Sequence, residues 1–355
     1  MPSPRAAERP ARPHLVPGRA YAPLLAGTAV ALVVAVVVAI GLGTVTVSPV
    51  DVLRVLAAHL RGQRYAVDPL ADQIVWQFRA PRVLLAALVG GALGVAGACL
   101  QNLVRNPLAD PYLFGVTSGA SFGAVIAMTG GLWLATTVGV TGFAFAGALL
   151  SLLAVFVLAQ RGGQLRGSDL VLAAIAVSYL GTAATSYLQL RARPAELRGV
   201  MFWLLGSLSS ATWPALAAPA VALGVAVLVL PVRAQAMNAL SLGDDTAAGL
   251  GVHPNRLRLL LLGMSALLTA AAVAAAGGIG FLGLIVPNAA RLLVGPDHRR
   301  MLPVAVLGGA LFLVLVDLAS RIIDRPNEIP IGIITAALGA PAFLVLLRRR
   351  RGGLA

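Results

Sequence analysis

The sequence predicts an all-α, polytopic membrane protein on the strength of its composition and its long stretches without charge. Hydrophobic residues make up 59% of the 355 positions and charged residues 11%, and the mean hydropathy is +0.89. Soluble domains carry about 25% charged residues, so this composition supplies too few polar side chains for a surface that faces water. Intrinsic disorder is excluded as well, because it requires low hydrophobicity and many charges.

The uncharged stretches predict ten membrane-crossing helices. A helix needs about 20 apolar residues to cross the hydrocarbon core, and the runs 20–50, 83–104, 170–190, 199–232 and 329–347 each supply one. Residues 111–160 suffice for two helices with a turn at Gly130-Gly131, and residues 259–290 divide near Gly277-Gly278. The run 301–316 continues as a helix through Asp317. The predicted helices are 21–43, 83–105, 112–130, 135–159, 169–190, 213–232, 257–276, 279–294, 301–320 and 329–347.

The arginines predict the orientation. An even number of helices places both termini on one side, and both terminal segments are basic, so both are expected in the cytoplasm. We expect residues 1–20 to form a flexible basic tail, residues 21–347 the membrane domain and residues 348–355 a second basic tail. The 21–43 segment is longer than the apolar region of a secretory signal. Several arginines still fall on the outer side and call for an explanation.

The residue inventory excludes several chemistries. All 27 basic residues are Arg, so the chain cannot carry the lysine that a Walker A loop places on nucleotide phosphates. A single cysteine, Cys99, excludes an internal disulfide and any multi-cysteine metal site. The four histidines are too scattered in the sequence for a metal site. We therefore expect this chain to bind no cofactor or metal of its own.

Three local patterns admit a chemical reading and a structural one. Gly278–Gly283 matches G-x-G-x-x-G, but it follows an Ala-rich helix rather than a strand, which disfavours dinucleotide binding. Gly119–Gly123 matches G-x-S-x-G, but Ser121 has no histidine base in the membrane, which disfavours an intramembrane protease. Asp317 and Arg321, at i and i+4, are read as a local ion pair or as part of an ion relay.

The loop 233–258 predicts a short surface helix between two spans. Ser241 is followed three residues later by Asp244, and Gly251 and Pro254 end the helical pattern. Such a helix either docks into a groove on a partner or is simply a solvated surface helix. The sequence pattern alone leaves this choice open.

Five long stretches carry a family resemblance: 76–124, which includes FRAPR and RNPLADP, then FWLLGSLSSATW at 202–213, MNALSLGDDTAAGLGV at 237–252, GGIGFLGLIVPNAARLLVGPDHRRMLP at 277–303 and EIPIGIITAALGAPAFLVLL at 328–347. On these stretches the chain resembles the permease subunits of bacterial ABC importers for iron–siderophores, haem and vitamin B12, which have the type II importer fold. The resemblance implies ten helices per subunit, a second copy of the chain, two ATPase subunits that bind ATP and Mg²⁺, and a periplasmic substrate-binding protein. It also implies the bacterial inner membrane and no enzymatic activity in this chain.

The resemblance assigns roles to matching residues. The coupling helix that docks on the ATPase matches Ser241, Leu242, Gly243, Asp244, Asp245, Ala248, Leu250 and Gly251. Docking of the binding protein matches Arg79, Arg82 and Arg321, and the cytoplasmic gate matches Asn106, Leu108, Gly167 and Ser168. Two positions depart from the family pattern: Gly167, where a hydroxyl residue is common, and Asn288, where His often follows the proline.

The substrate is the least determined feature. The 202–213 stretch and the nearby Arg191, Arg193 and Arg198 resemble haem importers slightly more than siderophore importers. Arginines near an outer mouth suit the two propionates of haem, although they also suit a binding protein or lipid head groups. Haem is therefore the favoured substrate, with a ferric siderophore next and cobalamin or another metal chelate after it. A different class, an ion-coupled secondary transporter, would need acids embedded in the membrane.

Overall fold

The structure is a computed structural model that describes the chain except for residues 1–15, 44–45, 63–67, 114, 131–132, 162–163, 166 and 352–355. It confirms the predicted fold class, because every predicted helix has a counterpart. These are α1 (Tyr21–Gly41), α4 (Ala80–Val104), α5 (Val116–Thr129), α6 (Trp133–Ala159), α7 (Gly167–Arg191), α9 (Ala217–Ser241), α11 (Pro254–Ala276), α12 (Leu282–Val294), α13 (His298–Ile322) and α14 (Ile331–Arg351). Seven of them are long and apolar enough to cross a membrane, and α5, α12 and α14 supply shorter apolar segments.

Several short elements lie between these helices and were not predicted, apart from the surface helix α10. They are α2 (Pro49–Arg61), α3 (Pro69–Asp72), a π-helical turn (Gln73–Arg79), α8 (Pro194–Leu204), α10 (Asp244–Gly249), a β-hairpin of β1 (Gln160–Arg161) and β2 (Gln164–Leu165), and 3₁₀ turns at Gly18–Ala20, Pro111–Leu113 and Trp213–Leu216. The largest, α2, begins at the Ser48 cap, whose hydroxyl accepts the Asp51 N–H, and ends at Gly62 with φ +64°. It is amphipathic and carries charges, so a search for uncharged runs does not find it.

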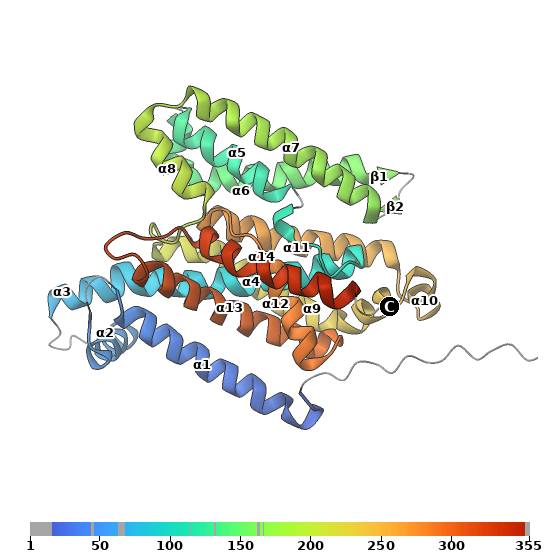
Figure 1. The fold of residues 1–355 in the computed structure, drawn as a ribbon, viewed down its shortest axis with the longest axis horizontal. Helices are drawn as coiled ribbons and strands as arrows, with labels where there is room; N and C mark the ends of the chain where they lie inside the picture. The colour runs from blue at the N-terminus through green and yellow to red at the C-terminus, as the bar shows by residue number, and fades with distance from the viewer. Residues whose placement is uncertain are drawn as a thin grey trace, which may run out of the picture.

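The helices form a bundle with a separate layer on one side (Figure 1). Helices α4 and α11 run through the middle, α5, α6, α7 and α8 form the layer drawn at the top, and α1 lies along the opposite edge. Figure 1 places α2, α3 and α8 at one end of the bundle, which we call the α2 end. The other end, the α10 end, carries α10, the start of α1 and the end of α14. The first and last helices thus have their free ends on one side, as an even number of crossings requires.

Helix α4 is held in the bundle by direct contact between backbones. A Cβ atom built on Gly90 would overlap the carbonyl oxygen of Gly309 in α13, and one built on Gly97 would overlap that of Gly283 in α12. Small residues allow such close approach in a membrane, where packing replaces the hydrophobic effect. These glycines therefore pack helices together, and Cys99 on the same helix is a fully buried small side chain.

The chain between α11 and α12 is broken rather than helical. Gly277 has φ +71° and Phe281 has φ +67°, both in the left-handed region, and α12 begins only at Leu282, later than the predicted residue 279. The backbone of Gly277 approaches the carbonyl of Trp203 so closely that no side chain fits there. The G-x-G-x-x-G pattern therefore follows helix α11, and no strand precedes it in the described part of this region.

Candidate functional site

A cavity of about 800 Å³ lies between α5 and α7, with residues 104–112 forming part of its wall. Its lining is rich in uncharged hydrogen-bonding groups. These include Thr117, Ser118 and Ser121 on α5, and Ser178, Thr182, Thr185, Ser186 and Gln189 on α7. Among the described residues that line it, Asp110 is the only one with a carboxyl group, and none is Arg or His. A wall of this kind can bind a large polar solute through hydrogen bonds without trapping a charge.

Two of the four predicted gate residues lie in this wall. Asn106 and Leu108 both line the cavity, and the Asn106 carboxamide oxygen accepts the Leu108 N–H at 3.0 Å. Asn288, the departure noted in the sequence, donates from Nδ2 to the Pro107 carbonyl at 2.8 Å and so attaches α12 to the same loop. Gly167 and Ser168 stand in the first turn of α7. Their part in the gate stays a prediction.

Asp110 connects the loop after α4 to the break before α12, a role that sequence reasoning missed. One carboxylate oxygen accepts the Tyr112 N–H at 2.9 Å and the other accepts the Phe281 N–H at 3.0 Å. Burial raises the pKa of Asp110 to about 6, and the two hydrogen bonds act in the opposite direction. The acid in RNPLADP is visible in the sequence, but its partner Phe281 lies 171 positions away.

We expect Asp110→Ala to destabilise the protein more than Asp110→Asn. Alanine leaves the Tyr112 and Phe281 N–H groups without acceptors, and a buried unsatisfied donor costs about 1–3 kcal/mol. Asparagine retains one oxygen acceptor and nearly the same shape. Melting temperatures of the purified variants in detergent measure the difference, and equal values for alanine and wild type would show that Asp110 does not hold the two segments together.

The predicted coupling segment folds differently from expectation at its start. Ser241 is the last residue of α9 and its hydroxyl donates to the Asn238 carbonyl at 2.6 Å, so it does not cap the surface helix. Gly243 is the N-cap instead, with φ +124°, and α10 covers only Asp244–Gly249. Around α10, Leu242, Asp245, Ala248, Leu250 and Gly251 are exposed. The segment thus presents a surface of mixed apolar and acidic character at the end of the bundle.

Asp244 ties α10 to two other elements. Its Oδ1 lies 2.8 Å from Nη2 of Arg258 in α11 and 3.5 Å from Nη2 of Arg105, which directly follows α4. Arg105 adopts a left-handed conformation, φ +54°, and immediately precedes Asn106 in the cavity wall. One carboxylate therefore connects α10 to Arg105, the residue before the loop that lines the cavity. The sequence did not reveal the two arginine partners.

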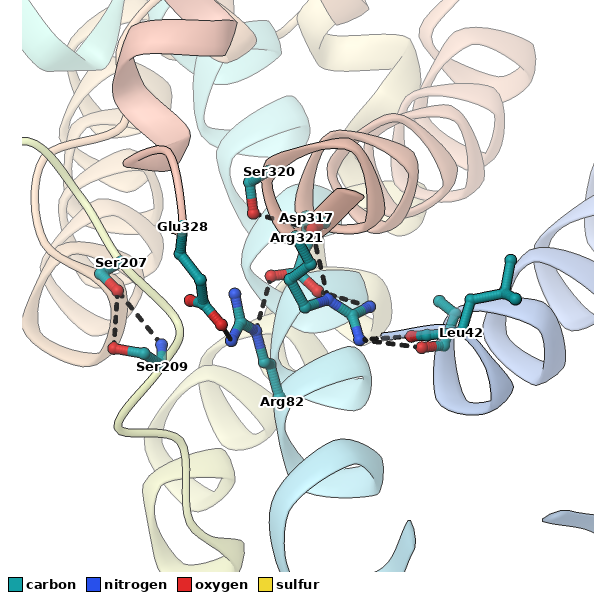
Figure 2. Close-up of polar contacts among 9 residues, drawn as sticks. Leu42, Arg82, Ser207, Ser209, Asp317, Ser320, Arg321 and Glu328 are labelled. Carbon is teal, nitrogen blue, oxygen red and sulfur yellow. Dashed lines mark hydrogen bonds and ion pairs between the residues drawn. The ribbon is translucent and has the colours of Figure 1, made fainter. Parts of the chain in front are cut away.

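The three arginines predicted to bind a partner protein are buried at the α2 end of the bundle. Arg82 donates from Nε to Asp317 at 2.8 Å and from Nη1 to Glu328 at 2.9 Å, while Arg321 lies 3.0 Å from the second Asp317 oxygen (Figure 2). Arg321 also donates to the carbonyls of Ala39 and Leu42 at the end of α1. Asp317, read from the sequence as one member of a local pair, is fully buried and shared by two arginines from different helices.

Arg79 completes this arrangement. Its Nη1 donates to the Ile40 and Gly41 carbonyls at 2.9 Å each, at the end of α1, where helix carbonyls lack partners within the helix. In this structure the guanidinium groups of Arg79, Arg82 and Arg321 join α1, α4 and α13 to one another. Binding of a partner protein by these arginines stays a prediction, and their internal contacts explain part of the outer arginine excess.

The three arginines assigned to the substrate mouth lie together at the α2 end and are exposed. Arg191 is the last residue of α7 and lies two positions after Gln189 of the cavity wall. It donates to the Tyr187 hydroxyl at 3.4 Å. Arg193 precedes α8, with its backbone N–H bound to Glu196, and Arg198 lies on α8. None of the three lines the cavity; they follow Gln189, the last residue of α7 in its wall, and put three exposed positive charges at the α2 end.

The comparisons with known proteins agree with this arrangement. The model of the FecCD transport family matches residues 31–349. The chain is 45% identical over 295 residues to the cobalamin import system permease protein BtuC of Halobacterium salinarum, covering 82% of this chain and 78% of that protein. It is 43% identical over 284 residues to the hemin transport system permease protein HmuU of Yersinia pestis, covering 78% and 84%.

A solved structure shares the fold over nearly the whole chain. It is described as an inward-facing conformation of a putative metal-chelate type ABC transporter. The TM-score is 0.80 at 34% identity, covering 93% of this chain and all of that one. The chain therefore belongs to the FecCD transport family: it is a multi-pass membrane permease of an ABC importer for metal chelates, and ATP is hydrolysed on separate subunits.

Proposed function

We propose that this permease carries haem from the periplasm to the cytoplasm as one of two identical membrane subunits. Membership of the family implies ATPase subunits, a substrate-binding protein and a dimer as partners. In the proposed assembly two ATPases bind ATP and Mg²⁺, and this chain binds no cofactor. The α10 end faces the cytoplasm of a bacterial inner membrane, with both termini there. The basic ends of the chain support this orientation under the positive-inside rule. Family membership removes the alternative of an ion-coupled secondary transporter.

The proposed mechanism is alternating access driven from α10. ATP binding and hydrolysis move the ATPases, and α10 follows them as a rigid element. The Asp244 contacts with Arg105 and Arg258 carry this movement to the end of α4 and to α11. Asn106 and Leu108 then open or close the cavity on the cytoplasmic side. The substrate-binding protein delivers its substrate at the α2 end. In this proposal it contacts Arg79, Arg82 and Arg321 there, after the surface at this end rearranges.

The observation that carries haem as the substrate is the arginine group beside the cavity. Arg191, Arg193 and Arg198 are exposed at the α2 end, and guanidinium groups bind carboxylates through paired hydrogen bonds. Haem presents two propionates on one edge. The arginines would orient this edge outward while the rest of the macrocycle enters the cavity, whose described lining contains no Arg or His.

A second candidate, cobalamin, is favoured by a different observation. The cavity wall contains hydroxyl and carboxamide groups rather than cations, which suits a chelate whose periphery carries amides. The relative from Halobacterium salinarum, named as a cobalamin permease, adds support. A ferric siderophore is the remaining alternative.

The substitution of Arg191, Arg193 and Arg198 by Gln distinguishes these substrates. The complete transporter, with its ATPase and binding protein, is placed in proteoliposomes and offered haem, cobalamin or a ferric hydroxamate. We expect haem uptake by the wild type and a loss of about tenfold or more in the triple variant, because exposed charge-assisted contacts to two carboxylates are removed. Arg54→Gln on α2, another exposed arginine at the same end, is the control.

Two results would overturn haem as the substrate, and a third would reject the role given to the arginines. Uptake of cobalamin but not haem would transfer the function to the second candidate, and uptake of the hydroxamate alone would transfer it to the third. Haem uptake that is unchanged in the triple variant would remove the arginines from substrate recognition.

A further inference from the structure

A second cavity, on the membrane-facing side, has no role in the proposed transport cycle. It measures about 220 Å³ and lies between α1, α4, α9 and α13. Leu25, Val227, Pro231, Leu302 and Pro303 are among its lining residues, and no polar atom contributes to the lining. Val227 and Pro231 are exposed, so the cavity is a groove that opens toward the lipid. We propose that this groove binds an acyl chain of an anionic glycerophospholipid from the leaflet at the α10 end.

The groove lies near one end of the helices that form it. Leu25 lies one turn beyond the start of α1 at Tyr21, and Leu302 and Pro303 lie in the first turns of α13, which begins at His298. These starts are at the α10 end of the bundle. The groove therefore begins near the head-group level and extends toward the middle of the membrane. An apolar groove open to hydrocarbon is filled by hydrocarbon, since leaving it empty would forfeit van der Waals contacts.

Positive charge gathers where the head group of such a lipid would lie. Arg299 and Arg300 stand in the first turn of α13, two or three positions before Leu302, and Arg233 follows Pro231 by two positions on α9; all three are exposed. The Arg300 guanidinium carbon lies 5.9 Å from the centre of the Tyr21 ring, which holds it beside α1. Neither Arg233 nor Arg300 forms an ion pair with a carboxylate in the portion of the chain that the structure describes.

One nearby acid, Asp297, offsets only part of the charge of these three arginines. Asp297 accepts from Asn238 Nδ2 at 2.7 Å and from the Arg299 N–H at 3.1 Å. Partial burial alone raises its pKa, but these hydrogen bonds and the charges of Arg299 and Arg300 lower it overall. Basic residues that flank an apolar groove between helices at the cytoplasmic surface are the arrangement that recognises anionic lipid head groups. A neutral lipid would fill the groove but would gain nothing from the arginines.

Native mass spectrometry of the full-length protein tests the proposal. The protein is purified in detergent and incubated with phosphatidylglycerol or with phosphatidylethanolamine carrying the same acyl chains. Two variants attack the two halves of the site: the double variant Arg233→Gln, Arg300→Gln removes the charges, and Val227→Trp fills the groove. Their matched controls are Arg348→Gln, an exposed arginine on α14, and Leu228→Trp, the exposed neighbour of Val227 outside the lining.

We expect the wild type to retain phosphatidylglycerol in preference to phosphatidylethanolamine. The double arginine variant should weaken phosphatidylglycerol binding about 25-fold, since each arginine near the surface strengthens anionic lipid binding by about fivefold. Val227→Trp should lose both lipids, and both controls should match the wild type. Equal retention of the two lipids by the wild type, or undiminished phosphatidylglycerol binding in the double variant, would overturn the proposal. Melting temperatures confirm that each variant is folded, and neither readout depends on the transported substrate.

Discussion

Arg82→Glu is expected to abolish stable folding of the permease, because it reverses the charge at the centre of a buried ionic network. The new carboxylate would stand beside Asp317, which is fully buried, and beside Glu328, and of the two arginines that now pair with Asp317 only Arg321 would remain. Breaking a buried ion pair by removing one partner costs about 3–5 kcal/mol. That is a large share of the roughly 5–15 kcal/mol by which proteins are stable. The yield of monodisperse protein in detergent and its melting temperature measure the effect.

Arg54→Glu is the matched control for this substitution. Arg54 also lies at the α2 end, but its side chain is 61% exposed and its ion pair is with Asp51 one turn away. Exposed pairs contribute about 0–1 kcal/mol, so this variant should fold normally. If Arg82→Glu retained the wild-type melting temperature and lost only its affinity for the binding protein, the docking role would be supported and the structural role of Arg82 rejected. Affinity measurements on Arg79, Arg82 or Arg321 variants are therefore informative only alongside a melting temperature.

Asp244→Asn is expected to separate ATP hydrolysis from transport. The substitution keeps the shape of the side chain but removes the charge that attracts both Arg105 and Arg258. In proteoliposomes that contain the complete transporter, we expect substrate uptake to fall about tenfold, while ATPase activity falls much less, because a coupling of about 1–3 kcal/mol corresponds to roughly 5–150-fold. The measured quantity is the number of substrate molecules imported per ATP hydrolysed.

Asp245→Asn provides the comparison. Asp245 is the adjacent residue of α10, is exposed, and forms no ion pair within the described chain. The Asp245→Asn substitution removes the same charge from the same helix but leaves the ion pairs of Arg105 and Arg258 in place. A smaller ratio of uptake to hydrolysis in both variants would mean that α10 needs its acids only for contact with the ATPase. Wild-type coupling in Asp244→Asn would reject the proposed link outright.

The membrane helices could be predicted because the bilayer imposes a simple rule on them. Crossing hydrocarbon requires about 20 apolar residues, and each predicted helix has its counterpart in the structure. The elements that were missed, α2 and α8, lie at the end of the bundle and obey no such rule. Both start with proline in the first turn and mix polar with apolar residues, so neither forms an uncharged run of about 20 residues of its own.

The side-chain partners were out of reach for a different reason. Arg82 and Asp317 are 235 positions apart, and Gln101 contacts the Gly283 carbonyl across 182 positions. No periodicity within one segment reports such pairs. The family resemblance predicted that Arg82 and Arg321 bind the substrate-binding protein. In the structure their contacts join α1, α4 and α13 within the subunit. The surface helix was predicted in the right place, but its cap at Gly243 depends on a backbone angle that composition does not reveal.

The contact between Gly90 and Gly309 constrains how the transporter can change shape. Because the two backbones are in contact, neither helix can slide or rotate against the other unless the two separate. We therefore expect α4 and α13 to move as one rigid unit. Gly119 and Gly147 fasten α5 to α6 in the same manner. Between α5 and α11, the helix that packs against α4, lies an interface of ordinary side chains, Val116, Ala120, Ala270 and Val273 among them. We therefore expect the helices to move against each other at this interface when the cavity empties, with the Arg105–Gly115 connection acting as the hinge.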